Sequence, residues 1–150
     1  MKMLLLLLLM SSPVYSATVG SLALTGIIPK KVEISVTPAP SASSLDLETT
    51  QTNLSVGTLT GKSNSVAGYK ISVSSANLGK LKHTVTPTQF VNYTLRIATT
   101  PIDLTTGGFI NYVGVGTYTK DVNISYTGVD GFLFDNGNYT DTVTFTVSAN

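Results

Sequence analysis

Short stretches of alternating apolar and polar residues recur along most of the chain. The alternation is clearest near the end, where threonines separate Val143, Phe145 and Val147. Successive side chains of a strand point to opposite faces, so each such stretch predicts a strand with one buried face. No stretch shows a convincing 3.6-residue apolar period of the kind that helices have. The other alternating stretches are Val32–Val36, Leu45–Leu47, Leu54–Leu59, Tyr69–Val73, Tyr93–Ile97 and Val122–Tyr126.

Residues that favour turns separate these stretches. Pro38 and Pro40 follow the first stretch, and a proline cannot donate a hydrogen bond to a strand ladder. Asp130-Gly131 predicts a hairpin turn between Val129 and Phe132. Other turns are predicted at Gly61–Asn64, Asn77–Gly79 and Asp135–Asn138, and a loop with room for a short edge strand at residues 99–116.

Many short strands with this spacing favour an all-β fold, an antiparallel sandwich of immunoglobulin-like type. Each predicted strand has one apolar and one polar face, as two sheets packed face to face require. Residues 29–150 contain no internal repeat and no sign of a boundary, so we expect a single sandwich domain there. The abundance of Thr, Ser, Val and Gly also favours strands over helices.

Residues 17–28 differ from the rest because they carry no charge and are followed by a proline. In an extended conformation, one face of this segment holds Gly20, Leu22, Leu24, Gly26 and Ile28. The pattern fits two interpretations equally well. The segment is either an ordinary first strand of the sandwich or a strand that is separated from the body at Pro29.

The first 16 residues have the layout of a secretory signal peptide. A short basic start, Met1–Met3, precedes the apolar run Leu4–Met10 and a stretch of small or turn-forming residues. The run is shorter than the roughly 20 residues that a membrane-spanning helix needs. We therefore predict cleavage after Ser16 and no membrane span in the mature chain. The alternative is an uncleaved membrane anchor.

The composition limits how the domain is stabilised and what it binds. The sequence has no cysteine, so packing and strand pairing must hold the fold without disulfides. Once Lys2 is removed with the signal peptide, basic and acidic residues are equal in number. A nearly neutral surface argues against nucleic acid or an anionic membrane as the partner.

The sequence offers little for catalysis or metal binding. His83 is the only histidine, and its neighbours do not suggest a carboxylate-oriented base, so we interpret it as a solvated strand or loop residue. Asp130, Asp135 and Asp141 lack the spacing of an EF-hand calcium loop, which favours turn and strand-edge roles. We therefore expect no enzymatic activity, no cofactor and no metal.

The last strand and the turn before it contain the run Gly-x-Tyr-x-Asp-x-Val, here Gly137, Tyr139, Asp141 and Val143, followed by alternating threonines and apolar residues. This run resembles the closing strand of chaperone–usher pilins and spore-coat-U-like proteins. Further blocks similar to fimbrial subunits of non-classical branches are Val56-Gly57-Thr58-Leu59-Thr60, Lys62-Ser63-Asn64, Gly68-Tyr69, Ser75-Ala76-Asn77, Gly79-Lys80-Leu81 and Tyr93-Thr94-Leu95.

Two features depart from classical pilins. The chain lacks the cysteines of a disulfide, and Ala149 stands where a penultimate tyrosine is common. The resemblance therefore points to an archaic or alternative branch of the family.

The resemblance implies a structural subunit of a fimbria, active in cell adhesion, that polymerises by donor-strand complementation and exchange. In that family a periplasmic chaperone first replaces a missing strand, and the N-terminal extension of a neighbouring subunit takes its place at an outer-membrane usher. The implied route is export through the periplasm to the cell surface. The implied donor residues are Gly20, Leu22, Leu24, Gly26 and Ile28, and the implied acceptor groove and chaperone contact consists of Val143, Phe145 and Val147.

Two other functions compete with this interpretation. The first is a self-contained secreted binding module for a carbohydrate or surface ligand, in which Tyr112, Tyr118 and Tyr126 line a sugar-binding face. Core and rim packing is the favoured role for these tyrosines. The second is a secreted enzyme that depends on His83.

Overall fold

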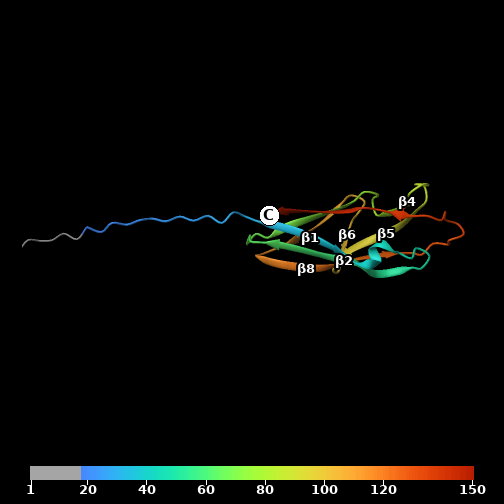
Figure 1. Ribbon diagram of the computed structural model, residues 1–150, viewed down its shortest axis with the longest axis horizontal. Coiled ribbons are helices and arrows are strands. Elements are labelled where there is room, and N and C mark those ends of the chain that lie inside the picture. Colours follow the sequence, from blue (N-terminus) through green and yellow to red (C-terminus); the bar gives the residue numbers. More distant parts are fainter. Residues whose placement is uncertain (1–17) are drawn as a thin grey trace, which may run out of the picture.

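The computed structural model describes residues 18–150, so the predicted signal peptide at residues 1–16 lies outside the described residues. Residues 32–150 form an elongated body, from one end of which residues 18–31 project (Figure 1). The elements of the body are β1 (Val32–Pro38), the 3₁₀ helix η1 (Pro40–Ser43), β2 (Gln51–Ser63), β3 (Tyr69–Ser75), β4 (Lys80–His83), β5 (Phe90–Ile97), β6 (Thr100–Ile102), β7 (Gly108–Tyr112), β8 (Gly116–Tyr126), β9 (Tyr139–Thr140) and β10 (Val143–Ala149).

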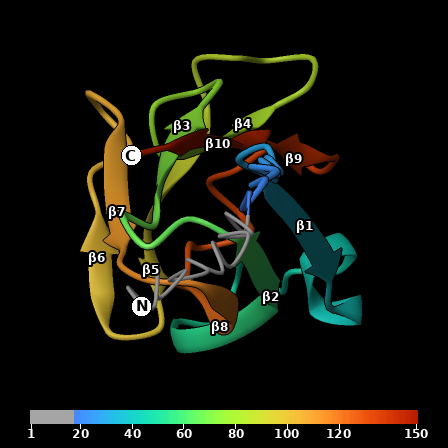
Figure 2. The same cartoon turned by 90° about the vertical axis from the view of Figure 1, so that its left-hand side faces the viewer.

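Two antiparallel sheets pack face to face, which confirms the predicted all-β sandwich. The larger sheet has the order β1-β2-β8-β5-β4-β9, with β6 also paired to β5, and the smaller has the order β10-β3-β7. The end-on view in Figure 2 shows that β1 and β10, the border strands of the two sheets, lie on the same side of the body.

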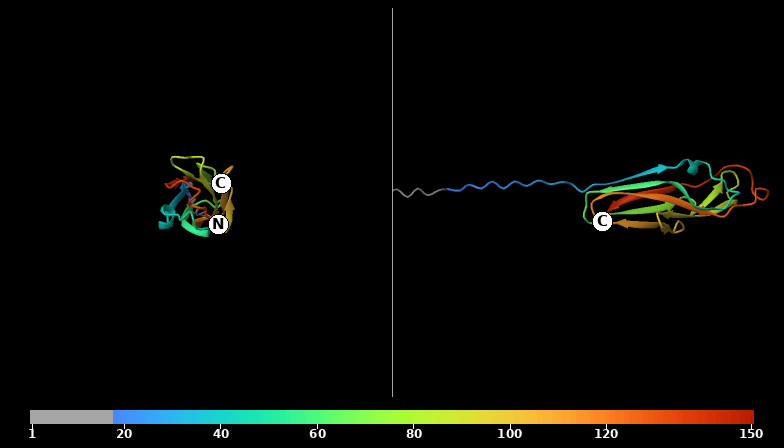
Figure 3. Two further views of the ribbon diagram at one scale, coloured as in Figure 1. Left: turned by 90° about the vertical axis from the view of Figure 1, so that its right-hand side faces the viewer. Right: turned by 90° about the horizontal axis from the view of Figure 1, so that it is seen from below.

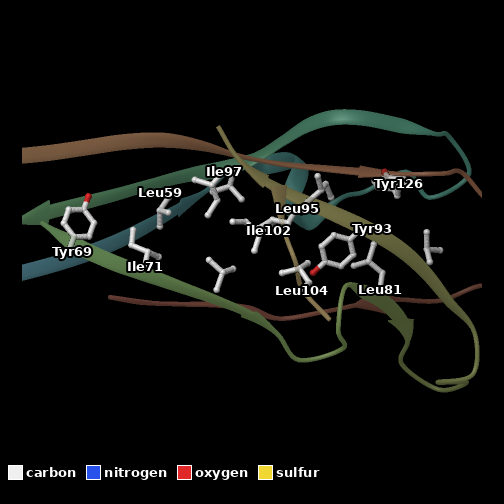
Figure 4. Close-up of a cluster of buried hydrophobic side chains, with 14 residues drawn as sticks. Leu59, Tyr69, Ile71, Leu81, Tyr93, Leu95, Ile97, Ile102, Leu104 and Tyr126 are labelled. Atoms are coloured by element: carbon white, nitrogen blue, oxygen red, sulfur yellow. The ribbon is translucent and has the colours of Figure 1, made fainter. Parts of the chain in front are cut away.

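Alternation along the strands builds the core. Every second residue of β3 and of β5 is buried, as expected for strands that turn one face to the opposite sheet. Figure 4 shows side chains of the two sheets meeting, with Leu59 and Leu95 on one side and Ile71 on the other. The buried apolar residues are Leu59, Tyr69, Ile71, Val73, Leu81, Val91, Tyr93, Leu95, Ile97, Ile102, Leu104, Val122, Ile124 and Tyr126.

Three local predictions were wrong. Leu45–Leu47 form no strand and instead pack against the core from an irregular segment after η1. Gly61 lies inside β2 rather than in a turn, because it pairs with β1 on one side and β8 on the other, and a side chain there would meet the Tyr69 ring. Asp130-Gly131 makes a turn inside the loop between β8 and β9, and no hairpin forms, because neither flank pairs as a strand.

The segment predicted as a loop at residues 99–116 is more regular than expected. It contains β6 and β7, joined by a turn in which Asp103 accepts hydrogen bonds from the Thr105 and Thr106 hydroxyls. These hydrogen bonds, with that of Thr105 the largest cause, lower the pKa of Asp103 to about 2. The carboxylate therefore stays charged and holds the turn between the two strands.

Residues 18–31 belong to neither sheet. They run away from the body as an extended segment, and Leu24 within it is 87% exposed (Figure 3). Of the two interpretations of this segment, the structure therefore does not show a first strand paired in its own sandwich. No helix within residues 18–150 is long and apolar enough to cross a membrane.

Candidate functional site: an apolar groove between two strand edges

Two strand edges border the same opening without pairing. Among the described residues, β1 pairs only with β2 and β10 pairs only with β3. The outer backbone edges of β1 and β10 thus remain available for hydrogen bonding. Such edges are natural templates for an added strand.

A groove of about 350 Å³ opens between these two edges. Its floor is the hydrophobic core, because buried residues of β4, β5 and β8 form it. Asp141 is the charged residue of its wall. The residues that line the groove are Val36, Pro38, Ala42, Leu45, Val56, Gly57, Leu81, Tyr93, Leu95, Val122, Ile124, Asp141, Thr142, Val143 and Phe145.

The groove contains two of the three residues that the sequence suggested for an acceptor. Val143, Phe145 and Val147 all lie half-buried against the core on one face of β10. Val143 and Phe145 line the groove, and Val147 lies further along β10, outside its lining. The opposite wall includes Val36, a residue that alternation identified as apolar without assigning it to a site.

Asp141 fixes the end of the groove where the chain crosses from β9 in one sheet to β10 in the other. Its Oδ2 accepts hydrogen bonds from the Ser75 hydroxyl at 2.5 Å and the Tyr93 hydroxyl at 2.6 Å. Its Oδ1 accepts the backbone N–H groups of Asn77 at 2.9 Å and Thr142 at 2.7 Å. Burial and then the hydrogen bond to Asp141 raise the pKa of Tyr93, so its hydroxyl remains a donor.

Gly137 and Tyr139 of the Gly-x-Tyr-x-Asp-x-Val run lie against His83. Gly137 has φ of +151°, and a side chain there would meet the imidazole ring. Tyr139 packs against the same ring, with 4.9 Å between centroids. The prediction of a solvated histidine was wrong, because His83 is only 5% exposed.

The hydrogen bonds of His83 define its neutral tautomer. Thr86 N–H donates to Nδ1 at 2.9 Å, so Nε2 carries the proton and faces the carbonyl oxygen of Asn136 at 3.3 Å. Both partners are backbone groups, which gives this ring a role in holding two loops together.

The remaining candidates do not converge on a site. Asp130 and Asp135 cap separate loop positions, and residues 18–150 contain no group of three His, Cys, Asp or Glu side chains placed to hold a metal. Tyr112 and Tyr118 stack with a centroid distance of 5.4 Å. Tyr126 is buried and its hydroxyl donates a hydrogen bond to the backbone carbonyl of Asp46, so the three tyrosines do not share one exposed face.

A single amide side chain holds the base of the N-terminal extension. Asn64 Oδ1 accepts the Lys31 N–H at 2.7 Å, and Asn64 Nδ2 donates to the Pro29 carbonyl at 3.0 Å. The Asn64 N–H also donates to the Lys31 carbonyl at 3.2 Å, and Lys30 Nζ donates to the Asn150 carbonyl. The sequence of residues 29–31 does not predict these contacts, because Asn64 lies 33 positions after Lys31.

The chain was compared with protein-family models and with curated proteins. No protein-family model matches the chain, and no significant match to it occurs among curated proteins.

Proposed function

We propose that this protein is a structural subunit of a surface fibre, a pilus or fimbria. In this proposal the N-terminal extension of one copy fills the groove of another copy and pairs with β1 and β10. A chaperone strand fills the same groove before assembly at an outer-membrane usher. The protein performs no catalysis in this role.

One observation carries the proposal: a groove with two available strand edges and a detached apolar segment occur in the same chain. The groove is lined mainly by aliphatic side chains, and residues 18–28 are uncharged, extended and exposed. In extended conformation Leu22, Leu24 and Ile28 lie on one face of the segment, so all three can enter the groove together.

The expected energies indicate that a donor strand contributes substantially to the stability of the domain. Burying one Leu or Ile side chain contributes about 1.5–3 kcal/mol, so three contribute about 5–9 kcal/mol. Net backbone hydrogen bonds add about 0.5–1.5 kcal/mol each. These sums are comparable with the whole stability of a typical domain, about 5–15 kcal/mol. An occupied groove therefore makes a tight joint that dissociates slowly.

A substitution on the donor face tests the proposal. We expect the purified mature chain to form multimers on size-exclusion chromatography, and Leu24→Lys to abolish them because a charge cannot enter the apolar groove. Thr25→Lys is the matched control, since residue 25 lies on the opposite face and stays exposed. The Leu24→Lys chain keeps its groove, so an added peptide of residues 19–28 should raise its unfolding temperature.

The self-contained binding module predicts a different result. In that case wild-type protein stays monomeric, Leu24→Lys behaves like Thr25→Lys, and the peptide leaves the unfolding temperature unchanged. That combination would reject the fibre-subunit proposal.

A further inference from the structure

We infer that neighbouring copies bind each other a second time, end to end, through apolar side chains at the two poles of the body. This inference rests on the proposed function and identifies a surface that the groove does not include. We define the root pole as the end where the extension attaches, with residues 29–31, 64–68 and 113–115. The distal pole is the opposite end, with the loops at residues 84–89 and 127–138 (Figure 1).

The length of the donor segment sets where the next body must lie. Residues 19–28 span about 33 Å when extended, and the seven-residue strands β1 and β10 span about 23 Å. The donor segment can therefore cover the whole groove. Its last residue, Ile28, is joined to its own β1 by residues 29–31 alone, so Ile28 lies at most about 14 Å from Val32. Asn64 also holds these residues against their own body. The donor body must therefore touch the pole of the acceptor at which the donor segment leaves the groove.

The donor segment can leave the acceptor groove at either pole, and only one of the two arrangements gives an open fibre. β1 runs from the root pole to the distal pole, and β10 runs back. A donor segment that runs parallel to β1 leaves the groove at the distal pole, so a root pole meets a distal pole. The opposite direction brings two root poles together, which gives a closed pair instead of a growing chain.

Both poles expose apolar side chains that the body does not need for its own packing. At the root pole Val66 is 82% exposed and Val113 is 75% exposed. At the distal pole Phe132 is 99% exposed, beside Leu133 in the same turn, and Val85 is exposed on the neighbouring loop. Hydrogen bonds from Asp135 N–H to Gln89 and from Thr86 to Asp135 join these two distal loops into one surface.

Charges at the two poles are complementary. The distal loops and the segment beside them carry Asp46, Glu48, Asp130 and Asp135, with Lys82 of β4 as their basic neighbour. The root pole presents Lys30 and Lys31 next to the extension, with Lys62 and the acidic Glu33 beside them, so its charge is mainly positive. Opposite charges around an apolar centre favour the root-to-distal arrangement over contacts between like poles.

A cross-linking experiment on the full mature chain tests the contact. The protein has no cysteine, so Val113→Cys and Phe132→Cys can be combined in one chain without other thiols. The loops that hold the two positions, residues 113–115 and 127–138, lie at opposite ends of the body (Figure 1), so a short bis-maleimide cannot join them within one molecule. We expect a ladder of multimers that survives boiling in detergent. The matched control combines Phe132→Cys with Phe109→Cys, an exposed position on the side of the sandwich, and should give no ladder.

A second variant measures the contribution of the contact. Phe132→Ser should make multimers dissociate about tenfold faster, because an apolar side chain is no longer buried between bodies. The same substitution in the Leu24→Lys chain should leave peptide-induced stabilisation unchanged. If the preparation multimerises but its cross-linked ladder is no stronger than that of the control, the contact between poles is rejected and the fibre-subunit proposal is not. Absence of both multimers and peptide-induced stabilisation would overturn the fibre-subunit proposal and this inference with it.

Discussion

Asp141 shows how one residue can organise the end of a groove. Its two carboxylate oxygens bind the turn after β3, the Tyr93 hydroxyl on β5 and the start of β10. The sequence presented Asp141 as one of three aspartates with turn or strand-edge roles, and that general assignment agrees with its position. Its partners could not be predicted, because Ser75, Asn77 and Tyr93 are far away in the chain.

We expect Asp141→Ala to lower the free energy of unfolding by about 2–4 kcal/mol, because two hydroxyls and two backbone N–H groups lose a charged acceptor. Urea denaturation of the Leu24→Lys chain, which we expect to stay monomeric, measures this change. Asp130→Ala is the control, because Asp130 bonds only within its own exposed turn and should change stability by about 0.5 kcal/mol or less. Equal stability of the two variants would contradict the assigned role of Asp141.

Tyr69 is buried with a hydroxyl that has no hydrogen-bond partner among the described residues. Burial, with smaller contributions from Tyr112 and Tyr118, raises the pKa of this hydroxyl to about 12. A raised folded-state pKa means that its contribution to stability is complete below the unfolded-state pKa near 10. The contribution is lost as pH rises from about 10 to about 12.

Tyr69→Phe should therefore cost little at neutral pH, since it removes an unpaired polar group and keeps the ring. It should also make the alkaline loss of stability shallower than in the parent chain. Urea midpoints between neutral pH and about pH 11 give both results. A large loss of stability at neutral pH would show that the hydroxyl has a partner in solution.

At the scale of elements, alternation predicted the long strands and little about their partners. β1, β2, β3, β5, β8 and β10 were all predicted because each has a regular apolar face. β4, β6, β7 and β9 are short, and their order depends on neighbours such as the Asp103 turn, so periodicity could not reveal them. The groove depends on which strands remain at the borders of the sheets. That arrangement is a property of topology and not of any one segment.

The inward face of β10 should control how well the groove binds a strand. We expect Phe145→Ala in the Leu24→Lys chain to weaken binding of the peptide of residues 19–28 by about tenfold or more, because the peptide loses apolar contact. Thr146→Ala changes the exposed face of the same strand and should leave binding unchanged. Calorimetric titration compares the two variants. Equal affinities would place the peptide elsewhere on the body.

At the scale of the whole molecule, the sequence predicted the sandwich and singled out residues 17–28 as unusual. It left open whether this segment joined its own sheet, because alternation is the same in both cases. The choice depends on the connection at residues 29–31 and on Asn64 in a distant turn, whose contacts only the folded chain displays. The exposed apolar residues at the two poles could not be predicted either, since Phe132 and Val113 are separate loop residues in the sequence.

The hydrogen bonds of Asn64 to Pro29 and Lys31 have a mechanical consequence for a fibre built in this way. A flexible linker would let neighbouring subunits take up many different orientations. Here the side chain and backbone of Asn64, with the Lys30 bond to the Asn150 carbonyl, fix the direction in which the chain leaves its body. In such a fibre every joint would therefore repeat the same bend and twist. We expect such a polymer to be a rod with a regular helical pitch, stiffened by contacts that lie outside the groove.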